Sequence, residues 1–462
     1  MTDTANSLKL PGHFTSGMVL QRGRSIPLYG TDTPGIKISV TLSDERQKTI
    51  FETVTVAAQS GAWECTLSPM AEGGPFTLTV SGSSTNCYTD IMCGDVWFCS
   101  GQSNMDMPIA DWGMVHDYQA ILAEAGDSGI RLLDIFNRQA LYPLTDAASD
   151  GWKACTAEHL RTFSAVAYCF ATRLRKKVSV PLGIIVSAVG GTRIETWMPK
   201  ETLQTLPFQH IDLPYLKRLI MTRSEVERQY LPTVNYNAMI APLTRFPVKG
   251  FLWYQGEANA VDPETYQQLC EAMIATWRAK WGDATLPFLF VQLANYGGEE
   301  GVWKDDDWAR LREAQEMVLQ IPDTGMVTAA DLGETNDIHP KKKKEVGERL
   351  ADLALQIVYG IESPYDVVKA ISVRESEAGL VLDIQHGEGL HSTLDDIQDF
   401  ETVTKDGKVI REKVILHENR IVLPDAKPGQ TDWVRYGWSN DPRLSIYNSR
   451  GNPLLPFRMQ VQ

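Results

Sequence analysis

The sequence predicts an α/β protein with a central three-layer α/β/α domain around a five-stranded parallel sheet, flanked by β-rich, sandwich-like domains. Three observations lead to this fold class. Both ends of the chain carry short segments in which apolar and polar residues alternate, as half-buried strands do. The middle carries five continuous apolar runs, which are typical of strands buried on both faces. Helical stretches separate those runs, as expected where helices cover a parallel sheet.

The change of pattern along the 462 residues divides the chain into three predicted domains. Residues 1–93 indicate a β-sandwich-like domain, because short strands alternate there with turn signals. Residues 94–360 form the α/β/α domain. Residues 361–462 form a second β-rich domain, in which Asp406-Gly407 is a strong hairpin signal.

The middle domain has a regular order of predicted elements. Its five apolar runs are residues 95–100, 181–189, 248–254, 287–294 and 324–331. Its predicted helices are residues 163–177, 263–281, 306–320 and 341–359. Because ligands of open α/β sheets bind beyond the carboxyl ends of the strands, the residues that follow each run are candidates for a functional site.

Composition excludes several classes of partner. The formal net charge of −14 repels phosphate backbones, so we expect no nucleic acid partner. No run approaches the roughly 18 apolar residues of a membrane span, so we expect no membrane partner. The seven cysteines include no CxxC pair and no His, Cys and Asp group has ligand spacing, so we expect neither a metal nor another cofactor. The oligomeric state stays open.

The start of the chain bears on its compartment. MTDTANSLKLPGHF has no basic start and no apolar stretch, so it does not resemble a signal peptide. We therefore expect a cytoplasmic protein, or a periplasmic or secreted one if a cleaved signal preceded this sequence.

The first two runs are followed by a serine and a pair of glycines. Ser103, in GQSNM after the first run, is either a nucleophile on an exposed turn or an ordinary helix N-cap. Gly190 and Gly191 follow the second run. Their backbone N–H groups either point at a ligand or belong to a plain tight turn.

Amide, carboxylate and imidazole groups follow two further runs. Gln255 and Asn259, in QGEAN after the third run, either interact with an oxyanion through an amide N–H or belong to a capped loop. His339 follows the fifth run with Asp337 two residues before it, which suggests a base with an orienting acid. Together these strand ends supply the groups that acyl transfer requires.

Four segments and both ends of the chain resemble one known family. GDVWFCSGQSNM, SAVGGTRIETWM, VKGFLWYQGEAN and DIHPKKKKEVGERLA are similar to blocks of the sialate O-acetylesterase family. MVLQRGRSIPLYG near the start and IYNSRGNPLLPFR near the end also resemble that family, so the similarity spans nearly the whole chain. The family is a branch of the SGNH (GDSL-like) hydrolases, which implies an SGNH hydrolase fold for residues 94–360.

The resemblance implies a role for each candidate. It makes Ser103 the nucleophile and His339 the base. It implies an oxyanion hole from the Ser103 N–H, a glycine N–H at residues 190–191, and the side chain of Gln255, with Asn259 as the second choice. The superfamily acid lies three residues before the histidine, where this chain has Asn336. Either Asp337 is the acid, or the enzyme is a Ser-His dyad assisted by a backbone carbonyl.

Arg193, Asn259 and Trp253 are candidates for contact with substrate. Arg193 either binds a sugar carboxylate or pairs with Glu195. Trp253 either forms an apolar wall for a sugar, with Trp197 and Tyr254, or packs in the core. The lysines 341–344 are interpreted as a solvated face, with attraction of a sialic carboxylate as the alternative.

The leading hypothesis is a serine esterase whose partner is an acetylated sugar, sialic acid above all. A second hypothesis is an acetylxylan or other polysaccharide O-acetylesterase, because the same groups serve both. A non-catalytic carbohydrate-binding protein is a third, and the intact pair of Ser103 and His339 argues against it.

Overall fold

The computed structural model describes residues 7–208, 212–298, 304, 306–397 and 399–461. The fold is mixed α/β, with one large mixed sheet and several smaller β-sheets. Within the described residues, no helix combines the length and the apolar character that a membrane crossing requires.

The chain forms two compact units. The first unit consists of Met1–Trp253 and Ala272–Phe288, and the second of Tyr254–Glu271 and Leu289–Gln462. Helix α8 (Tyr266–Trp281) contributes residues to both.

The first unit holds the N-terminal strands and part of the large sheet. Its strands are β1 (Val19–Gln21), β2 (Ile26–Thr31), β3 (Lys37–Ser43), β4 (Thr49–Val56), β5 (Ala62–Leu67), β6 (Gly73–Ser81), β7 (Thr85–Gly101), β8 (Ile130–Asp134), β9 (Lys153–Ala154), β10 (Leu182–Ala188) and all but the last residue of β11 (Gly250–Tyr254). Its helices are α1 (Ser103–Asp106), α2 (Tyr118–Ala123), α3 (Ala157–Leu160), α4 (Ala165–Arg175), α5 (Lys200–Leu203), α6 (Leu213–Thr222) and α7 (Glu225–Arg228), with short turns η1 (Ile194–Trp197), η2 (Tyr236–Ile240) and η3 (Ala241–Leu243).

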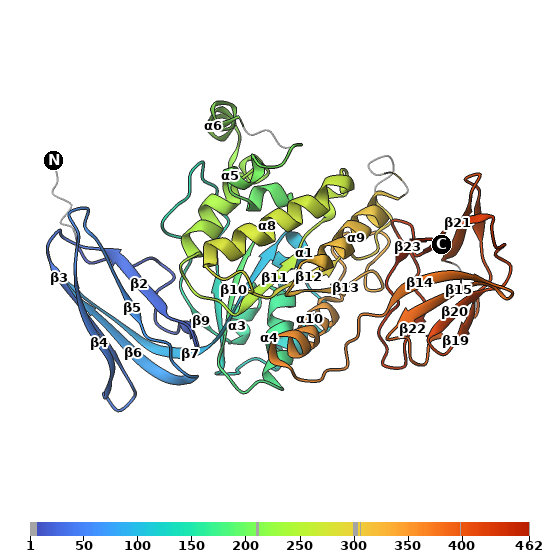
Figure 1. The fold of residues 1–462 in the computed structure, drawn as a ribbon. Coiled ribbons are helices and arrows are strands. Elements are labelled where there is room, and N and C mark those ends of the chain that lie inside the picture. The colour runs from blue at the N-terminus through green and yellow to red at the C-terminus, as the bar shows by residue number, and fades with distance from the viewer. Residues whose placement is uncertain (1–6, 209–211, 299–303, 305, 398, 462) are drawn as a thin grey trace. The chain divides into compact units, whose positions relative to one another are not determined.

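Strand β7 continues from the N-terminal β region into the large sheet (Figure 1). Its first part pairs antiparallel with β6, and residues 95–101 pair in parallel with β10. Every residue from 93 to 101 is buried, as expected for a strand that is covered on both faces. The predicted domain boundary between residues 93 and 94 therefore falls inside one continuous strand.

Strand β8 pairs in parallel with β10. The sequence analysis did not predict this strand, so the predicted count of five parallel strands did not include it. The segment IRLLD was missed because a charged residue interrupts its apolar pattern. Arg131 is only 6% exposed, and its guanidinium pairs with Asp90 at 3.0 Å. The ion pair makes the buried charge tolerable in the strand.

The second unit holds the remaining elements. Its helices are α9 (Asp307–Met317) and α10 (Lys343–Tyr359), with the turns η4 (Glu257–Asn259), η5 (Pro263–Thr265) and η6 (Val318–Gln320). Its strands are all but the first residue of β12 (Phe288–Gln292), then β13 (Thr324–Thr328), β14 (Lys369–Ser376), β15 (Gly379–Gln385), β16 (His391–Ser392), β17 (Phe400–Thr404), β18 (Val409–Arg411), β19 (Ile415–His417), β20 (Arg420–Leu423), β21 (Thr431–Tyr436), β22 (Ile446–Tyr447) and β23 (Phe457–Gln460).

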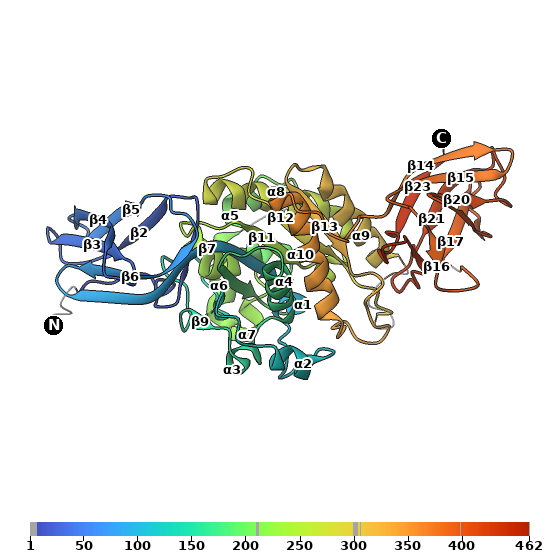
Figure 2. The same ribbon diagram turned by 90° about the horizontal axis from the view of Figure 1, so that it is seen from below.

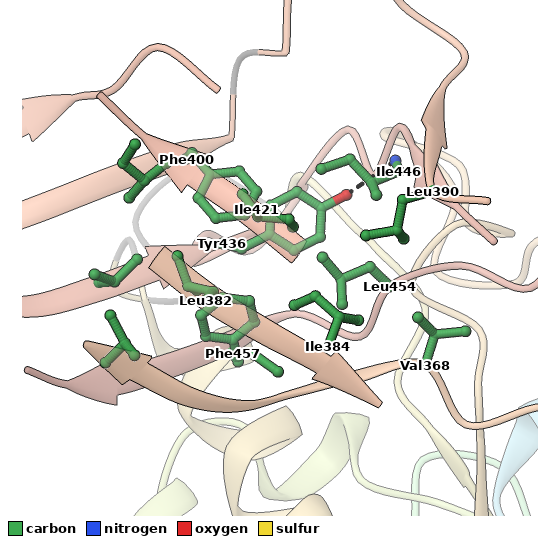
Figure 3. Packing of buried hydrophobic residues seen from close by; sticks show 14 of the residues in the cluster. Val368, Leu382, Ile384, Leu390, Phe400, Ile421, Tyr436, Ile446, Leu454 and Phe457 are labelled. Carbon is green, nitrogen blue, oxygen red and sulfur yellow. Dashed lines mark hydrogen bonds between the residues drawn. The ribbon is translucent and has the colours of Figure 1, made fainter. Parts of the chain in front are cut away.

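The C-terminal strands enclose a core of their own. One four-stranded sheet has the order β14-β15-β20-β19 and another has the order β18-β17-β21-β23. Figure 2 shows these strands gathered around the C-terminal end of the chain. Leu382 and Ile421 from the first sheet and Phe400 and Tyr436 from the second belong to one buried cluster (Figure 3). The Tyr436 hydroxyl is satisfied there, because it accepts the backbone N–H of Ile446 at 3.2 Å.

Most predicted elements are confirmed. The five apolar runs correspond to β7, β10, β11, β12 and β13. The four predicted helices correspond to α4, α8, α9 and α10. The long periodic segments were predicted best, since their burial pattern repeats over several turns.

Helix α1 is too short to be stable alone, and Ser164 anchors it. The Ser164 hydroxyl donates to the backbone carbonyl of Met105 at 2.6 Å and accepts the N–H of Ala167 at 3.2 Å. The same side chain therefore caps α4 and holds α1, and it is only 2% exposed.

We predict that Ser164→Ala destabilises the protein by about 1–2 kcal/mol, because a buried carbonyl and an N-terminal helix N–H both lose their partner. Thermal unfolding followed by circular dichroism measures the change. Ser224→Ala is the matched control, since Ser224 caps α7 at an exposed position. An equal or smaller shift for Ser164→Ala would contradict the anchoring role.

Candidate active site

Strand register brings Ser103 next to the turn formed by Gly190 and Gly191, called the glycine turn below. β7 and β10 are parallel, and Gly101 at the end of one lies opposite Ala188 at the end of the other. Two residues further on, the chains reach Ser103 and Gly190. A Cβ atom on Gly190 would lie 3.4 Å from the Cβ of Ser103. The structure therefore places these two candidate residues next to each other.

Ser103 begins α1, and its side chain is half-buried between two buried polar neighbours. Gln102 is 3% exposed and Asn104 is 1% exposed. The backbone N–H groups of Met105 and Asp106 both bond the carbonyl of Gln102 at 2.9 Å, which fixes the turn directly after the strand. The hydroxyl thus stands at the carboxyl edge of a parallel sheet, where ligands bind.

The glycine turn is held by a chain of amide groups. The Gln229 side chain donates to the carbonyl of Gly190 at 3.2 Å, and Asn137 donates to Gln229 at 3.0 Å. Gly191 has a φ of +71°, a conformation that favours glycine. The ring of Tyr230 lies 3.1 Å from the place where a Cβ on Gly191 would be.

The residues proposed for an apolar sugar wall are buried. Trp253 is 1% exposed and packs edge-to-face against Trp197 and Trp277, with ring centroids 6.4 and 5.8 Å away. Trp253 is therefore a core residue in this structure. Of the two alternatives that the sequence left open, core packing is the one observed. Tyr230 was not found from the sequence. This residue is 49% exposed beside the glycine turn, in a segment that carries no motif.

Arg193 pairs with Glu195, as one of its two sequence interpretations expected. The two side chains meet at 3.1 Å, and Glu195 is 6% exposed. The Arg193 side chain keeps 35% of its surface exposed, so its guanidinium can contact solvent and solutes.

Two carboxyl groups at the same sheet edge were also missed. Desolvation raises the pKa of Asp106, on α1, to about 6. Desolvation and the charge of Asp106 raise the pKa of Asp134, at the end of β8, to about 7. Acidic residues are common in this chain, so no sequence signal distinguished this pair. Near neutral pH such a pair can both donate and accept hydrogen bonds.

In the second unit, Gln255 and Asn259 form one hydrogen-bonded group. The Gln255 amide donates to the side-chain carbonyl of Asn259 at 2.7 Å. The hydroxyl of Tyr266 donates to the side-chain oxygen of Gln255 at 3.0 Å. Both amide side chains are fully buried. Because the Asn259 carbonyl accepts from Gln255, its N–H₂ group points away from Gln255.

The turn after β11 has little freedom. The Gln315 side chain donates to the backbone carbonyl of Gln255 at 3.1 Å. Gly256 has a φ of +155°, and a Cβ there would lie 2.7 Å from a methyl group of Leu311. The amide pair therefore stands on a rigid turn, as a preorganised donor requires.

Asp337 and His339 lie close together, but their hydrogen bond runs through the backbone. Asp337 Oδ1 accepts the backbone N–H of His339 at 2.8 Å, while the same oxygen lies 3.9 Å from Nδ1 of the imidazole. The other carboxylate oxygen lies 3.7 Å from Nζ of Lys341. Asp337 therefore shapes the loop and adds a nearby negative charge.

The surroundings of His339 favour the neutral ring. Burial is the largest cause that lowers its pKa, followed by the charge of Lys343. Asp337 acts in the opposite direction, and Lys341 lowers the pKa further. A neutral imidazole can accept a proton, so the environment suits a general base.

Each unit assembles part of the predicted set. The first contains Ser103 with Gly190 and Gly191, and the second contains Gln255 with Asn259 and Asp337 with His339. Over the part of the chain that the structure describes, no group of three or more His, Cys, Asp or Glu side chains is placed to hold a metal ion.

Comparisons with known proteins agree with this chemistry. The family described as carbohydrate esterase, sialic acid-specific acetylesterase, matches residues 93–356. A sialate O-acetylesterase of Homo sapiens is 31% identical over 386 residues, which cover 76% of this chain and 71% of that protein. One of Mus musculus is 27% identical over 508 residues, covering 96% and 93%.

A solved structure is similar over nearly the whole chain. A carbohydrate acetylesterase from Xanthomonas citri is 33% identical and gives a TM-score of 0.87, with 98% of this chain and 99% of that chain covered.

Proposed function

The chain belongs to the carbohydrate esterase family of sialic acid-specific acetylesterases, and from this premise we propose that Ser103 and His339 remove O-acetyl groups from sialic acid. That the protein is a carboxylic ester hydrolase of acetylated sugars follows from the family. The residue roles and the choice of sugar are our proposal. The observation that supports it most is the position of Ser103 against the glycine turn. The Cβ of Ser103 lies 3.4 Å from the point where a Cβ on Gly190 would be. The proposal includes a three-layer SGNH-type domain around the parallel strands.

The mechanism proceeds through an acetyl-enzyme. Oγ of Ser103 attacks the acetyl carbonyl carbon while its proton passes to His339. The tetrahedral intermediate collapses, the bond to the sugar oxygen breaks, and the imidazolium returns the proton to that oxygen. Water then attacks the acetyl-enzyme, His339 again takes the proton, and acetate leaves as Ser103 is restored.

The oxyanion needs donors that are fixed before the reaction. Its proposed donors are the backbone N–H groups of Ser103 and the glycine turn, together with an amide N–H from the buried pair. The bond from Gln255 to Asn259 makes this pair act as one unit. Gln255 either donates directly or orients Asn259 to do so.

The sugar contacts follow from exposure and charge. Tyr230 offers an exposed ring beside the glycine turn for the apolar face of a pyranose. Asp106 and Asp134 offer hydrogen bonds to hydroxyl groups. Arg193 is the proposed ligand of the sialic carboxylate, because the net charge of −14 otherwise opposes an anion.

We expect Ser103→Ala to lower kcat on an acetylated chromogenic ester by on the order of 10⁶-fold, because the nucleophile is lost. Circular dichroism should show an unchanged fold, since the helix start accepts alanine. Near-normal turnover in the purified variant would refute the assignment of the nucleophile.

Release of acetate from O-acetylated sialic acid and from acetylated xylan identifies the substrate. We expect a higher kcat/KM on the sialic acid, and Arg193→Gln should raise KM on that sugar alone, because only that sugar carries a carboxylate. A preference for xylan would favour the polysaccharide hypothesis. Binding without hydrolysis of either sugar would favour a carbohydrate-binding protein.

For the amide pair, we expect Gln255→Ala to lower kcat by about 10²–10³-fold with a modest change in KM, because an oxyanion donor acts in the transition state. Asn259→Ala should have a similar effect. The double variant should be little worse than either, since linked groups are not additive. A raised KM with normal kcat in Gln255→Ala would instead assign Gln255 to substrate binding and the oxyanion to Asn259.

Asp337→Asn tests whether the acid completes a triad. The asparagine keeps an oxygen for the N–H of His339, so the loop persists while the charge disappears. We expect kcat to fall by more than about 10²-fold, against roughly 10⁴ for a full triad acid. Retention of most activity at neutral pH would make Asp337 a loop residue and the enzyme a dyad.

A further inference from the structure

Lys343 is a buried lysine at the first position of α10. The sequence analysis interpreted residues 341–344 as a solvated face, and for Lys343 that interpretation is wrong. Its exposed fraction is 0%, whereas the adjacent Lys344 is exposed. A buried ammonium group is costly unless nearby groups compensate it, so its position calls for an explanation.

The ammonium group holds the loop that carries His339. Nζ of Lys343 donates to the backbone carbonyl of Pro340 at 2.6 Å. Pro340 directly follows His339, and its ring already restricts the backbone there. The hydrogen bond therefore fixes the main chain one residue from the proposed base.

The same group also faces the segment that carries the amide pair. Nζ lies 5.8 Å from the ring centroid of Tyr254, the residue before Gln255. Glu257, between Gln255 and Asn259, is 4% exposed, and its charge is the main one that favours the protonated lysine. Lys343 thus has electrostatic links to both proposed catalytic segments of the second unit.

Charge couples Lys343 to the imidazole. Burial is the largest cause that lowers the pKa of Lys343 to about 7, and the charge of Lys341 lowers it further. The negative charges of Glu257, Asp337 and Glu334 raise the pKa and partly offset this effect. Below pH 7 the ammonium form therefore prevails. In that range its positive charge opposes protonation of His339.

We propose that Lys343 is a positioning residue that joins the turn of residues 255–259 to the loop of residues 336–340 and keeps His339 neutral in mildly acidic solution. This inference rests on the proposed function, in which His339 is the base. Lys343 itself touches neither substrate nor the reacting atoms. It acts through the Pro340 carbonyl and through its charge.

The test is the pH profile of kcat/KM for Lys343→Met, with Lys344→Met as the matched control. Methionine fills a similar volume without the charge. Removal of the charge raises the pKa of His339, so the acidic limb should move to higher pH by about half a unit or more. Loss of the loop contact should also lower the plateau by about 10-fold or more. Lys344→Met should leave both features unchanged.

Lys343→Met removes a positive charge that interacts with the buried carboxylate of Glu257, and this loss can prevent folding. The variant Lys343→Met/Glu257→Gln removes both charges, and its acidic limb should move in the same direction. If the acidic limb of the pH profile of this double variant lies at the same pH as that of the unchanged protein, the proposal is overturned. An equal shift in Lys344→Met would also overturn it, because the effect would then be one of general surface charge.

His339→Ala separates failure of this inference from failure of the proposed function. If His339→Ala keeps normal activity, His339 is not the base, and the proposed function fails with everything built on it. If His339→Ala is inactive and the limb of Lys343→Met does not move, only the role of Lys343 fails.

Discussion

The parallel pairing of β7 with β10 is the constraint on which the first half of the site depends. The register sets Gly101 opposite Ala188, so the chain leaves both strands at the same level. A shift by one residue would turn every buried side chain of β10 to the other face. Since β7 is buried from residue 93 to 101 and β10 along its whole length, such a shift would place each buried side chain in a space that is packed for a different residue. Core packing thus fixes the distance between Ser103 and Gly190.

In the second unit, buried polar groups take the place of strand register. Gln255, Asn259, Tyr266 and Gln315 are each at most 1% exposed, and each has a hydrogen-bond partner in this group. An unpaired buried amide would cost about 1–3 kcal/mol, so the members hold one another in place. This network explains why several polar residues can follow the buried strand β11, and it leaves the amide pair little freedom to rotate.

The sequence predicted strand ends and helices well, because long apolar runs and periodic helices carry a strong signal. It also predicted the neighbours Ser103 and Gly190, since the ends of parallel strands meet at one edge. It did not predict β8, where Arg131 interrupts the run, or Tyr230, which lies in a segment without a motif. Lys343 was misread because four consecutive lysines look equally solvated. Which of them points inward depends on the helix start, and no local pattern fixes that position.

The groups around His339 show how the environment can adjust a base in two directions. A base must be neutral to accept a proton, yet its affinity for the proton must remain high. Burial and the lysines favour the neutral ring, while Asp337 favours the imidazolium that forms during attack. With Nδ1 3.9 Å away and the Asp337 oxygen bonded to the backbone, this carboxylate acts mainly through its charge and through the loop. In the proposed mechanism, Asp337 would therefore stabilise the imidazolium through its charge and not through a direct hydrogen bond to Nδ1.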